Sequence, residues 1–248
     1  NAKILILDEP TSSLDEKEIE SWSRLIRVLT HEIMNSITPI TSLSETLITI
    51  NEGGNEEITQ GLEVIRTTAK SLISFVDAYR RLTRIPMPEK HPFYIKPFLE
   101  RQIRLGIRAL DGSVNQLVRT SVSIDNPELL LYGDEDLLGQ VVSNLIKNAL
   151  QAIEHTLAGN RHTVEGYVPL VSLHAYTNEA QEILIEVSDN AGGIPQEIVQ
   201  NMFVPFFTTK ENGSGIGLSL SRQIMRLHNA SLKLTTNTTG KTTFTLCF

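Results

Sequence analysis

The first third of the chain repeats apolar residues with the period of an α-helix. Between Glu18 and about Ile50 they recur every three or four residues, which keeps them on one stripe of a helix. The segment NEGGN at residues 51–55 interrupts the pattern with turn residues, and a second stripe runs from Ile58 to Tyr79. The pattern predicts an antiparallel helical hairpin over residues 18–84. Its apolar seam stays uncovered, so we expect two copies to pair as a dimeric four-helix bundle.

The pattern changes after a proline-rich stretch, Arg84–Pro92, which cannot continue a helix, and we expect a linker over residues 85–92. From residue 93 to 248 strand and helix patterns interleave, which predicts an α/β sandwich. The expected strands are Leu117–Ile124, Leu170–Tyr176, Ile183–Ser188, Leu232–Thr236 and Thr242–Phe248, the last two paired around Gly240, and the expected helices are Ile95–Leu105, Glu135–His155 and Ile216–His228. The predicted fold class is therefore α plus α/β.

Composition excludes several functional classes. A net charge of −7 argues against binding nucleic acid, which requires clustered Lys and Arg. The single cysteine, Cys247, cannot form an internal disulfide and fits a reducing compartment. No apolar run reaches membrane-spanning length. We expect a cytoplasmic fragment with no direct membrane contact, which leaves open an inner-membrane anchor in a longer parent protein.

His31 is the first candidate for chemistry. Its position relative to the apolar stripe places it on the wet face of the first helix, where a second domain can reach it. An isolated surface histidine usually has no function, but Glu32 beside it can hold one ring proton and leave the other nitrogen nucleophilic. Asn35 lies one turn further on the same face. Pro39 removes the amide that would bond to the Asn35 carbonyl, which predicts a kink near this site.

A second group of candidates lies in the α/β part. Asn144 and Asn148 share one helix face, as two side chains that cradle a metal–triphosphate should, although such pairs are usually plain surface amides. Asp189 follows a buried strand and precedes Gly192 and Gly193. Its carboxylate can accept from the exocyclic amine of adenine and would repel the carbonyl of guanine. A simple strand-ending turn is the alternative interpretation.

A glycine-rich segment, with Gly213, Gly215 and Gly217, opens the last predicted helix. Glycines allow the backbone to approach phosphates at the positive end of a helix, although this pattern alone is often only a turn. The Phe-rich segment Phe203–Gly213 leads into it and suggests a lid over a nucleotide. Lys210 in this segment is placed to meet phosphate charge, although exposed lysines are usually only solvated.

The order of these segments resembles the ATP-binding domain of histidine kinases, which belongs to the superfamily of gyrase, Hsp90 and MutL. The segment LTHEIMNSITPI resembles the phosphoacceptor box of the same family, and PFFTTKENGSGIGLSLSRQIM is most similar to the nitrogen-regulation type. This resemblance implies an ATP-binding set of Asn144, Lys147, Asn148, Asp189, Gly193, Phe207, Lys210, Gly213, Gly215, Gly217 and Leu218, with Asn148 also a ligand of Mg²⁺.

The resemblance also implies roles and partners. His31 takes the γ-phosphoryl group of ATP and passes it to an aspartate in the receiver domain of a response regulator. Glu32 assists this transfer, and Asn35 positions water for dephosphorylation of the partner. The family works as homodimers controlled by a sensor module, which we expect to lie outside this chain.

Two features leave alternatives open. Ala191 stands where the family usually has glycine, and a positive φ there would cost about 1 kcal/mol. It is the only sequence support for a catalytically weak ATP-binding scaffold. The second alternative is a hydrolysing gyrase-like ATPase. Those relatives carry a glutamate where this chain has Asn144, and an amide cannot act as a general base, so we expect slow hydrolysis.

The N-terminal residues 1–17 resemble something else. KILILDEPTSSLD is similar to the Walker B segment of ABC-transporter ATPases, with Asp8 and Glu9 at the active positions. That machinery needs a GxxxxGK[ST] loop and an LSGGQ-type signature, and the chain contains neither. We therefore interpret these residues as a connector or a fusion-derived segment and exclude Asp8 and Glu9 from the site.

Overall fold

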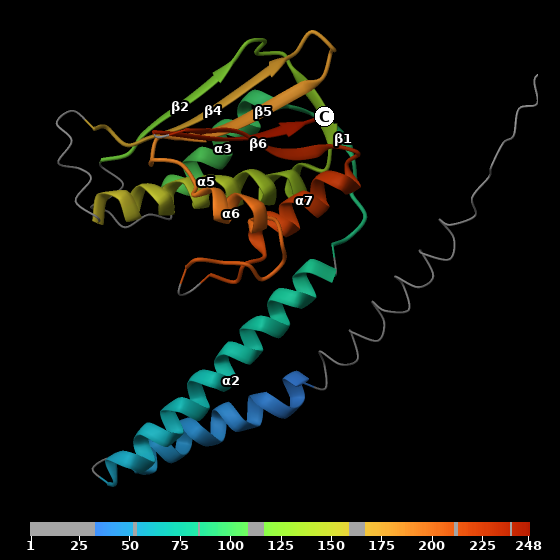
Figure 1. The fold of residues 1–248 in the computed structure, drawn as a ribbon. Coiled ribbons are helices and arrows are strands. Elements are labelled where there is room, and N and C mark those ends of the chain that lie inside the picture. Colours follow the sequence, from blue (N-terminus) through green and yellow to red (C-terminus); the bar gives the residue numbers. More distant parts are fainter. Residues whose placement is uncertain are drawn as a thin grey trace, which may run out of the picture. The chain divides into compact units, whose positions relative to one another are not determined.

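The computed structural model describes residues 33–51, 54–83, 85–108, 117–158, 167–210, 213–238 and 240–248. The chain divides into two compact units, Asn1–Arg84 and Ile85–Phe248 (Figure 1). His31, Glu32 and the Walker B-like segment lie outside the described residues. None of the helices in the described part of the chain is long and apolar enough to cross a membrane.

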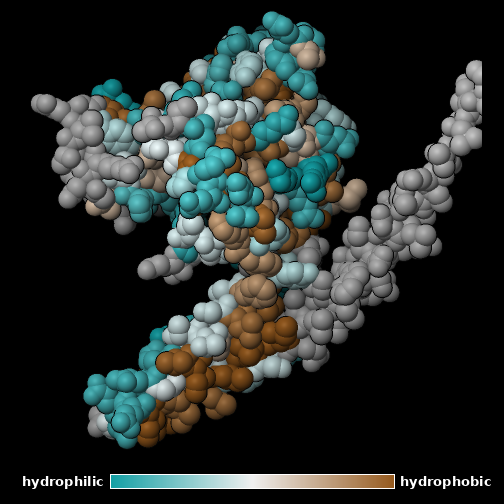
Figure 2. All heavy atoms as spheres, in the orientation of Figure 1, coloured by the Kyte–Doolittle hydropathy of each residue, from teal (hydrophilic) through white to brown (hydrophobic). Residues whose placement is uncertain are grey.

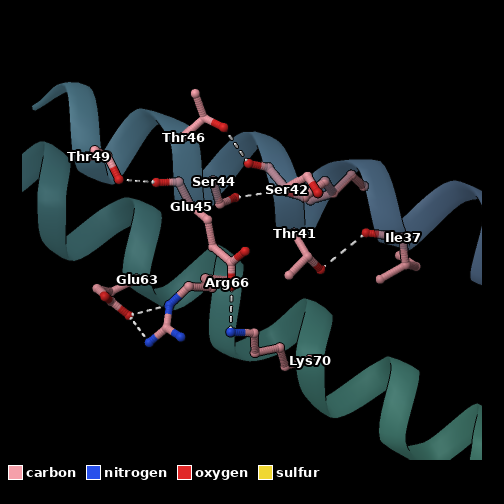
Figure 3. Close-up of polar contacts among 11 residues, drawn as sticks. Ile37, Thr41, Ser42, Ser44, Glu45, Thr46, Thr49, Glu63, Arg66 and Lys70 are labelled. Carbon is pink, nitrogen blue, oxygen red and sulfur yellow. Dashed lines mark hydrogen bonds and ion pairs between the residues drawn. The ribbon is translucent and has the colours of Figure 1, made fainter.

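The first unit is a helical hairpin. A helix over residues 33–50 is followed by a turn and by α2 (Glu56–Thr83). The Asn55 side chain accepts from the backbone N–H of Glu57 at 2.8 Å, which caps the start of α2. Between the helices, Lys70 Nζ lies 2.6 Å from Glu45 Oε1 (Figure 3). This ion pair holds the pKa of Glu45 below its usual value. Over the described residues 33–51 and 54–83, the predicted hairpin is confirmed.

Apolar surface remains uncovered on this hairpin. Ala69 and Val76 of α2 are buried, but other large apolar side chains of both helices are exposed, as the brown band along the hairpin in Figure 2 shows. Among them are Ile40, Leu43, Leu47, Ile50, Ile58, Val64, Ile65, Leu72 and Phe75. Contiguous exposed apolar surface of this kind marks an interaction site. The four-helix bundle stays a prediction, because only one copy of the chain is described.

The second unit contains a five-stranded mixed sheet in the order β2-β4-β5-β7-β6. Its strands are β2 (Arg119–Ile124), β4 (Leu170–Thr177), β5 (Ile183–Asp189), β6 (Ser231–Thr238) and β7 (Lys241–Cys247). Strands β2 and β4 run parallel, and the other neighbours are antiparallel. Gly240, with φ of 106°, makes the turn between β6 and β7. All five strands lie where the sequence pattern predicts them.

Helices α3 (Ile95–Arg108), α5 (Glu135–Ala158) and α7 (Gly217–Leu227) cover one face of this sheet (Figure 1). The alternation along β4 explains the layering, because Val171, Leu173 and Ala175 are fully buried while the residues between them are not. On the helical side, α5 contributes a continuous buried stripe that includes Val142 and Ile146. The predicted α/β sandwich is confirmed.

The start of α5 is fixed by a side-chain cap. Both the N–H of Asp136 and the N–H of Leu137 donate to Oδ1 of Asp134, at 3.1 and 3.0 Å. Burial alone would raise the pKa of Asp134, but these bonds and one from the Glu89 N–H hold it below its usual value. The N–H of Asp134 in turn donates to Nε2 of His228, the C-cap of α7, so one residue anchors two helices.

Three elements are absent from the sequence prediction. A two-stranded sheet joins β1 (His91–Tyr94) to β3 (Leu130–Gly133), and α6 (Gln196–Asn201) is a helix of six residues. The expected linker over residues 85–92 therefore ends too late, since His91 and Pro92 pair with β3. Strands of four residues are too short to show a period, and proline is tolerated in a strand at a sheet edge.

Candidate functional site

The outer face of α5 carries the first group of predicted site residues. Asn144, Lys147, Asn148 and Gln151 are spaced at intervals of three and four, so they share one face. Lys147 is exposed and the other three are half-buried, while the opposite side of α5 faces the core. The helix therefore presents amide oxygens and an ammonium, and no carboxylate, along this stretch of its face.

Asp189 ends β5 inside the molecule, with 8% of its surface exposed. Its Oδ1 accepts from the Ala191 N–H at 3.0 Å, and the Thr242 side chain gives a further hydrogen bond. Burial nevertheless raises the pKa of Asp189 to about 6, because these bonds offset only part of the lost hydration. A buried carboxylate with unused acceptor capacity suits a donor such as an exocyclic amine.

The backbone of the turn after Asp189 shows whether alanine at position 191 is strained. The positive φ values lie at Gly192 (110°) and Gly193 (88°), and Ala191 is not among the described residues with positive φ. The Ala191 carbonyl accepts from the Thr156 hydroxyl of α5 at 2.7 Å. Alanine therefore fits this backbone, and the expected cost of about 1 kcal/mol does not arise.

The first turn of α7 closes around Asn144. A Cβ at Gly217 would lie 2.3 Å from Oδ1 of Asn144, so only glycine leaves room for this amide. One turn later, Asn144 Nδ2 donates to Oγ of Ser221 at 3.1 Å. Asn144 is thus clamped between two positions of α7 that are four residues apart. Leu218 between them is half-buried and packs against the core.

The glycine-rich segment also packs directly against the Phe-rich segment. Phe206 adopts φ of 67°, and its N–H donates to the carbonyl of Gly215 at 2.9 Å. A Cβ at Gly215 would lie 2.4 Å from the carbonyl carbon of Phe206, and one at Gly213 would lie 2.3 Å from the Thr208 hydroxyl. Phe207, the predicted lid aromatic, is half-buried. The predicted lid is therefore held to the start of α7 by close backbone contact.

Lys210 reaches back from this lid to α5. Its Nζ lies 3.2 Å from Oδ1 of Asn148 and 2.5 Å from Oε1 of Gln151. Partial burial of the ammonium and the nearby charge of Lys147 lower the pKa of Lys210. Two amide oxygens of α5 thus bind the positively charged ammonium of Lys210. Oxygen atoms are also the ligands that Mg²⁺ prefers. Asn148 therefore fits the predicted role of a metal ligand.

A metal at this position would need ligands beyond the protein. Among the described residues, no group of three or more His, Cys, Asp and Glu side chains could hold a metal ion. Mg²⁺ commonly combines one or two protein oxygens with phosphate oxygens and water. The donor set around Asn148 is of that kind.

The structure brings together several predicted residues and adds three. Asn144 meets Gly217, Asn148 meets Lys210, and Asp189 is joined to α5 through the Ala191–Thr156 bond. The additions are Gln151, Ser221 and Tyr167. Partial burial and the charge of Asp189 raise the pKa of the Tyr167 hydroxyl. The spacing of Gln151 from Asn148 could have indicated the first; the other two depend on chain segments that only the fold brings close.

The phosphoacceptor prediction is only partly covered. His31 and Glu32 lie outside the described residues, and Asn35 is exposed on the helix over residues 33–50. An exposed position agrees with the wet face expected for this residue. The roles of all three residues stay predictions.

Comparison with known proteins shows which proteins the chain resembles. Residues 133–248 match the model described as histidine kinase-, DNA gyrase B-, and HSP90-like ATPase. The nitrogen regulation protein NtrY of Azorhizobium caulinodans is 25% identical over 93% of this chain and 29% of its own length. The sensory histidine kinase/phosphatase NtrB of Rhodobacter capsulatus is 26% identical over 94% of this chain and 63% of its own length. Over most of its length the chain is thus similar to two-component sensor histidine kinases of the nitrogen-regulation type.

Solved structures show a similar fold. The structure of full-length ShkA in complex with AMPPNP superposes with a TM-score of 0.62 at 16% identity, over 90% of this chain and 45% of that chain. The chain thus spans 29% of NtrY and 63% of NtrB, so these relatives contain further parts.

Proposed function

We propose that this chain is the catalytic core of an ATP-dependent protein histidine kinase that phosphorylates His31 and passes the phosphoryl group to an aspartate of a response regulator. One observation carries the proposal. The α/β unit combines a buried carboxylate, Asp189, and a glycine-lined helix start with an amide, Asn144, where hydrolysing relatives have a carboxylate. Such a site can bind ATP, and the amide of Asn144 cannot act as the base for its hydrolysis.

The residues of the pocket divide the binding of ATP between them. Asp189 accepts a hydrogen bond from the exocyclic amine of adenine. Gly193 has no side chain and leaves room for the base beside the backbone. The first amides of α7, from Gly217 and Leu218, meet the phosphates at the positive end of the helix. Asn148 would hold Mg²⁺, which would neutralise charge on the phosphates. The structure of ShkA with AMPPNP supports ATP as the nucleotide.

Asn144 accounts for slow hydrolysis of ATP before the phosphoryl group is transferred to His31. Its amide nitrogen is engaged with Ser221, and an amide has no proton affinity that would activate water at neutral pH. A neutral histidine is the better nucleophile near pH 7, because its usual pKa is about 6.5. A ring nitrogen of His31 then bonds to the γ-phosphorus as the bond to the bridging oxygen breaks and ADP leaves. Glu32 holds the proton on the other ring nitrogen.

Partners and location follow from the same proposal. The exposed apolar band of the hairpin supports a homodimer, and the names of the NtrB relatives, histidine kinase/phosphatase, support a second activity on the response regulator. Asn35 would position the water for that phosphatase reaction. The need for ATP supports a cytoplasmic location for this part of the protein, with its input from a sensor module.

The test is a labelling experiment. Incubation with γ-labelled ATP and Mg²⁺ should give acid-labile, base-stable label on the protein, and His31→Gln should abolish it. Label that persists in His31→Gln would overturn the assignment. Rapid ATP turnover that survives this substitution would instead favour a hydrolysing ATPase. The scaffold alternative loses its support, since Ala191 fits the backbone it occupies.

A further inference from the structure

The hydrogen bonds between Lys210 of the lid and α5 have no role in the function proposed so far. The ammonium of Lys210 sits 3.2 Å from the amide oxygen of Asn148 and 2.5 Å from that of Gln151. These two acceptors lie three residues apart on one face of α5. Hydrogen bonds to a charged donor are stronger than neutral ones, so this contact fixes the lid chain at Lys210 relative to the helix.

Gln151 supplies the shorter of the two contacts but has no place in the pocket's chemistry. It lies one turn beyond Asn148, towards the end of α5, and no step of the proposed reaction uses it. Its side-chain oxygen accepts from the Lys210 ammonium. The Gln151 side chain in this position holds the Lys210 ammonium next to the amide oxygen of Asn148.

This arrangement excludes a metal ion from the same oxygen. With Lys210 beside Oδ1, a second cation on that atom would meet like-charge repulsion at short range, where Coulomb energies are largest. Lys147 on the same face adds a further positive charge. Lys210 must therefore leave Asn148 before Asn148 can hold a metal ion, and Gln151 opposes that departure.

We propose that Gln151 is a positioning residue that holds the lid lysine, Lys210, against the metal ligand Asn148. A divalent cation then has to displace this ammonium, and the exchange sets the metal dependence of nucleotide binding. The proposal rests on the proposed function, because it takes Asn148 as the metal ligand. It adds a residue and a competition that the family resemblance does not imply. It makes lid release and metal binding a single event.

The experiment measures ADP binding by titration calorimetry on the full chain, with Mg²⁺ varied and with EDTA as the metal-free arm. ADP lacks the γ-phosphate, which separates the competition from any contact between Lys210 and that group. Gln151→Met removes the acceptor oxygen and keeps the side-chain length. Gln151→Ala is the second variant, and Gln140→Met, at an exposed position of the same helix, is the control.

Both Gln151 variants should raise the apparent Mg²⁺ affinity of the ADP complex about threefold to tenfold, as expected when one charge-assisted hydrogen bond no longer opposes lysine release. In EDTA they should match the wild type, and Gln140→Met should match it throughout. Lys210→Met should also strengthen the response to Mg²⁺. Adding Gln151→Met to Lys210→Met should then change nothing further, because the two act through one contact.

Three results would overturn the inference: Gln151 variants with wild-type Mg²⁺ dependence, weaker Mg²⁺ binding in both of them, or an undiminished Gln151 effect in the Lys210→Met background. The second would make Gln151 a metal ligand itself. The circular dichroism spectrum identifies a misfolded variant, and the other substitution then carries the test. Failure of the proposed function looks different, since the wild type would then neither bind ADP with Mg²⁺ nor label His31.

Discussion

Asn144 of α5 donates a 3.1 Å hydrogen bond to Ser221 of α7, and its amide also fills the space that a side chain at Gly217 would need. The two helices are therefore interlocked at the point where α7 begins. The amide of Asn144 therefore has a structural task, which is to hold the start of α7 against α5.

The first prediction tests this interlock with a double-mutant cycle. Gly217→Ala places a Cβ 2.3 Å from Oδ1 of Asn144 and should destabilise the protein by about 1–3 kcal/mol, as overpacking does. In the Asn144→Ala background the space is open, so the same substitution should cost much less. Urea unfolding of the four proteins measures the coupling. Additive effects would show that Asn144 does not restrict Gly217.

The second prediction separates backbone strain from close contact at the lid. Gly215 and Gly240 both have positive φ, 65° and 106°, but a Cβ at Gly215 lies 2.4 Å from backbone carbon of Phe206, whereas nothing lies within 4 Å at Gly240. Gly240→Ala should cost only the conformational penalty of about 1–2 kcal/mol. Gly215→Ala should cost more and also weaken ATP binding, because Phe206 must move.

Calorimetric ATP titration and thermal unfolding of these two variants provide the measurement. If Gly240→Ala weakens ATP binding as much as Gly215→Ala does, then general loss of stability explains both. If neither variant affects binding, the backbone contact at Phe206 has no role in the pocket.

The third prediction concerns the buried carboxylate. Asp189 has a pKa of about 6 in the folded protein against 3.8 for the ordinary group, so ionised Asp189 is disfavoured by burial. At pH 7.5 the wild type carries this unfavourable charge and Asp189→Asn does not. The variant should be more stable by up to about 3 kcal/mol, from roughly 1.4 kcal/mol per pKa unit. It should nevertheless bind ATP poorly, since an amide cannot reproduce the acceptor-only carboxylate.

The pH dependence follows from the same raised pKa. As the pH falls through 6 towards 4, folded Asp189 takes up a proton before the unfolded chain does, so the wild type gains stability relative to Asp189→Asn. The stability difference between the two proteins should shrink over that range. ATP binding by the wild type should weaken below pH 6, because the protonated carboxyl loses acceptor capacity. A constant difference from pH 7.5 to 4 would show that folding does not raise the pKa of Asp189.

The sequence predicts most of the fold because burial imposes a clear period. Val171, Leu173 and Ala175 of β4 alternate with less buried residues, and the stripe of α2 repeats every three or four residues, so the order of apolar residues alone indicates both elements. Strands β1 and β3 bury little beyond Phe93 and Leu131. Their pairing depends on residues about forty positions apart, which a local pattern does not record.

The site is predictable as a set of positions but not as a set of contacts. Motif spacing indicates Asn144, Asn148 and Lys210 individually. Their hydrogen-bond partners are 77 residues away for the Asn144–Ser221 bond and 62 for the Lys210–Asn148 bond. Only the packing of α5 against α7 and the lid determines which side chains meet. This is why Ser221 carries no recognisable signal in the sequence, and why the spacing of Gln151 does not reveal its partner.

The fourth prediction concerns the hairpin. Ile40, Leu43, Leu47 and Ile50 form an exposed stripe on the helix over residues 33–50, and Leu43 is 62% exposed. Leu43→Glu would place a charge in the seam of the proposed bundle, which is costly without a partner, and should yield monomers by light scattering. Ser42→Glu introduces the same charge off this stripe and should leave the dimer intact. Dimers that survive Leu43→Glu would place the interface elsewhere.

The fifth prediction separates two reactions at one helix. Asn35 is exposed on the helix over residues 33–50, and the proposed phosphotransfer to His31 itself needs no water. Asn35→Ala should therefore retain His31 labelling and lose most dephosphorylation of a phosphorylated receiver domain, a loss of about 10²-fold or more if the amide orients the attacking water. Both reactions are measured on one protein preparation, with Ser42→Ala as the control at another exposed position of that helix. Equal loss of both activities would indicate that Asn35 maintains the helix, because a water-positioning role cannot impair a transfer in which water takes no part.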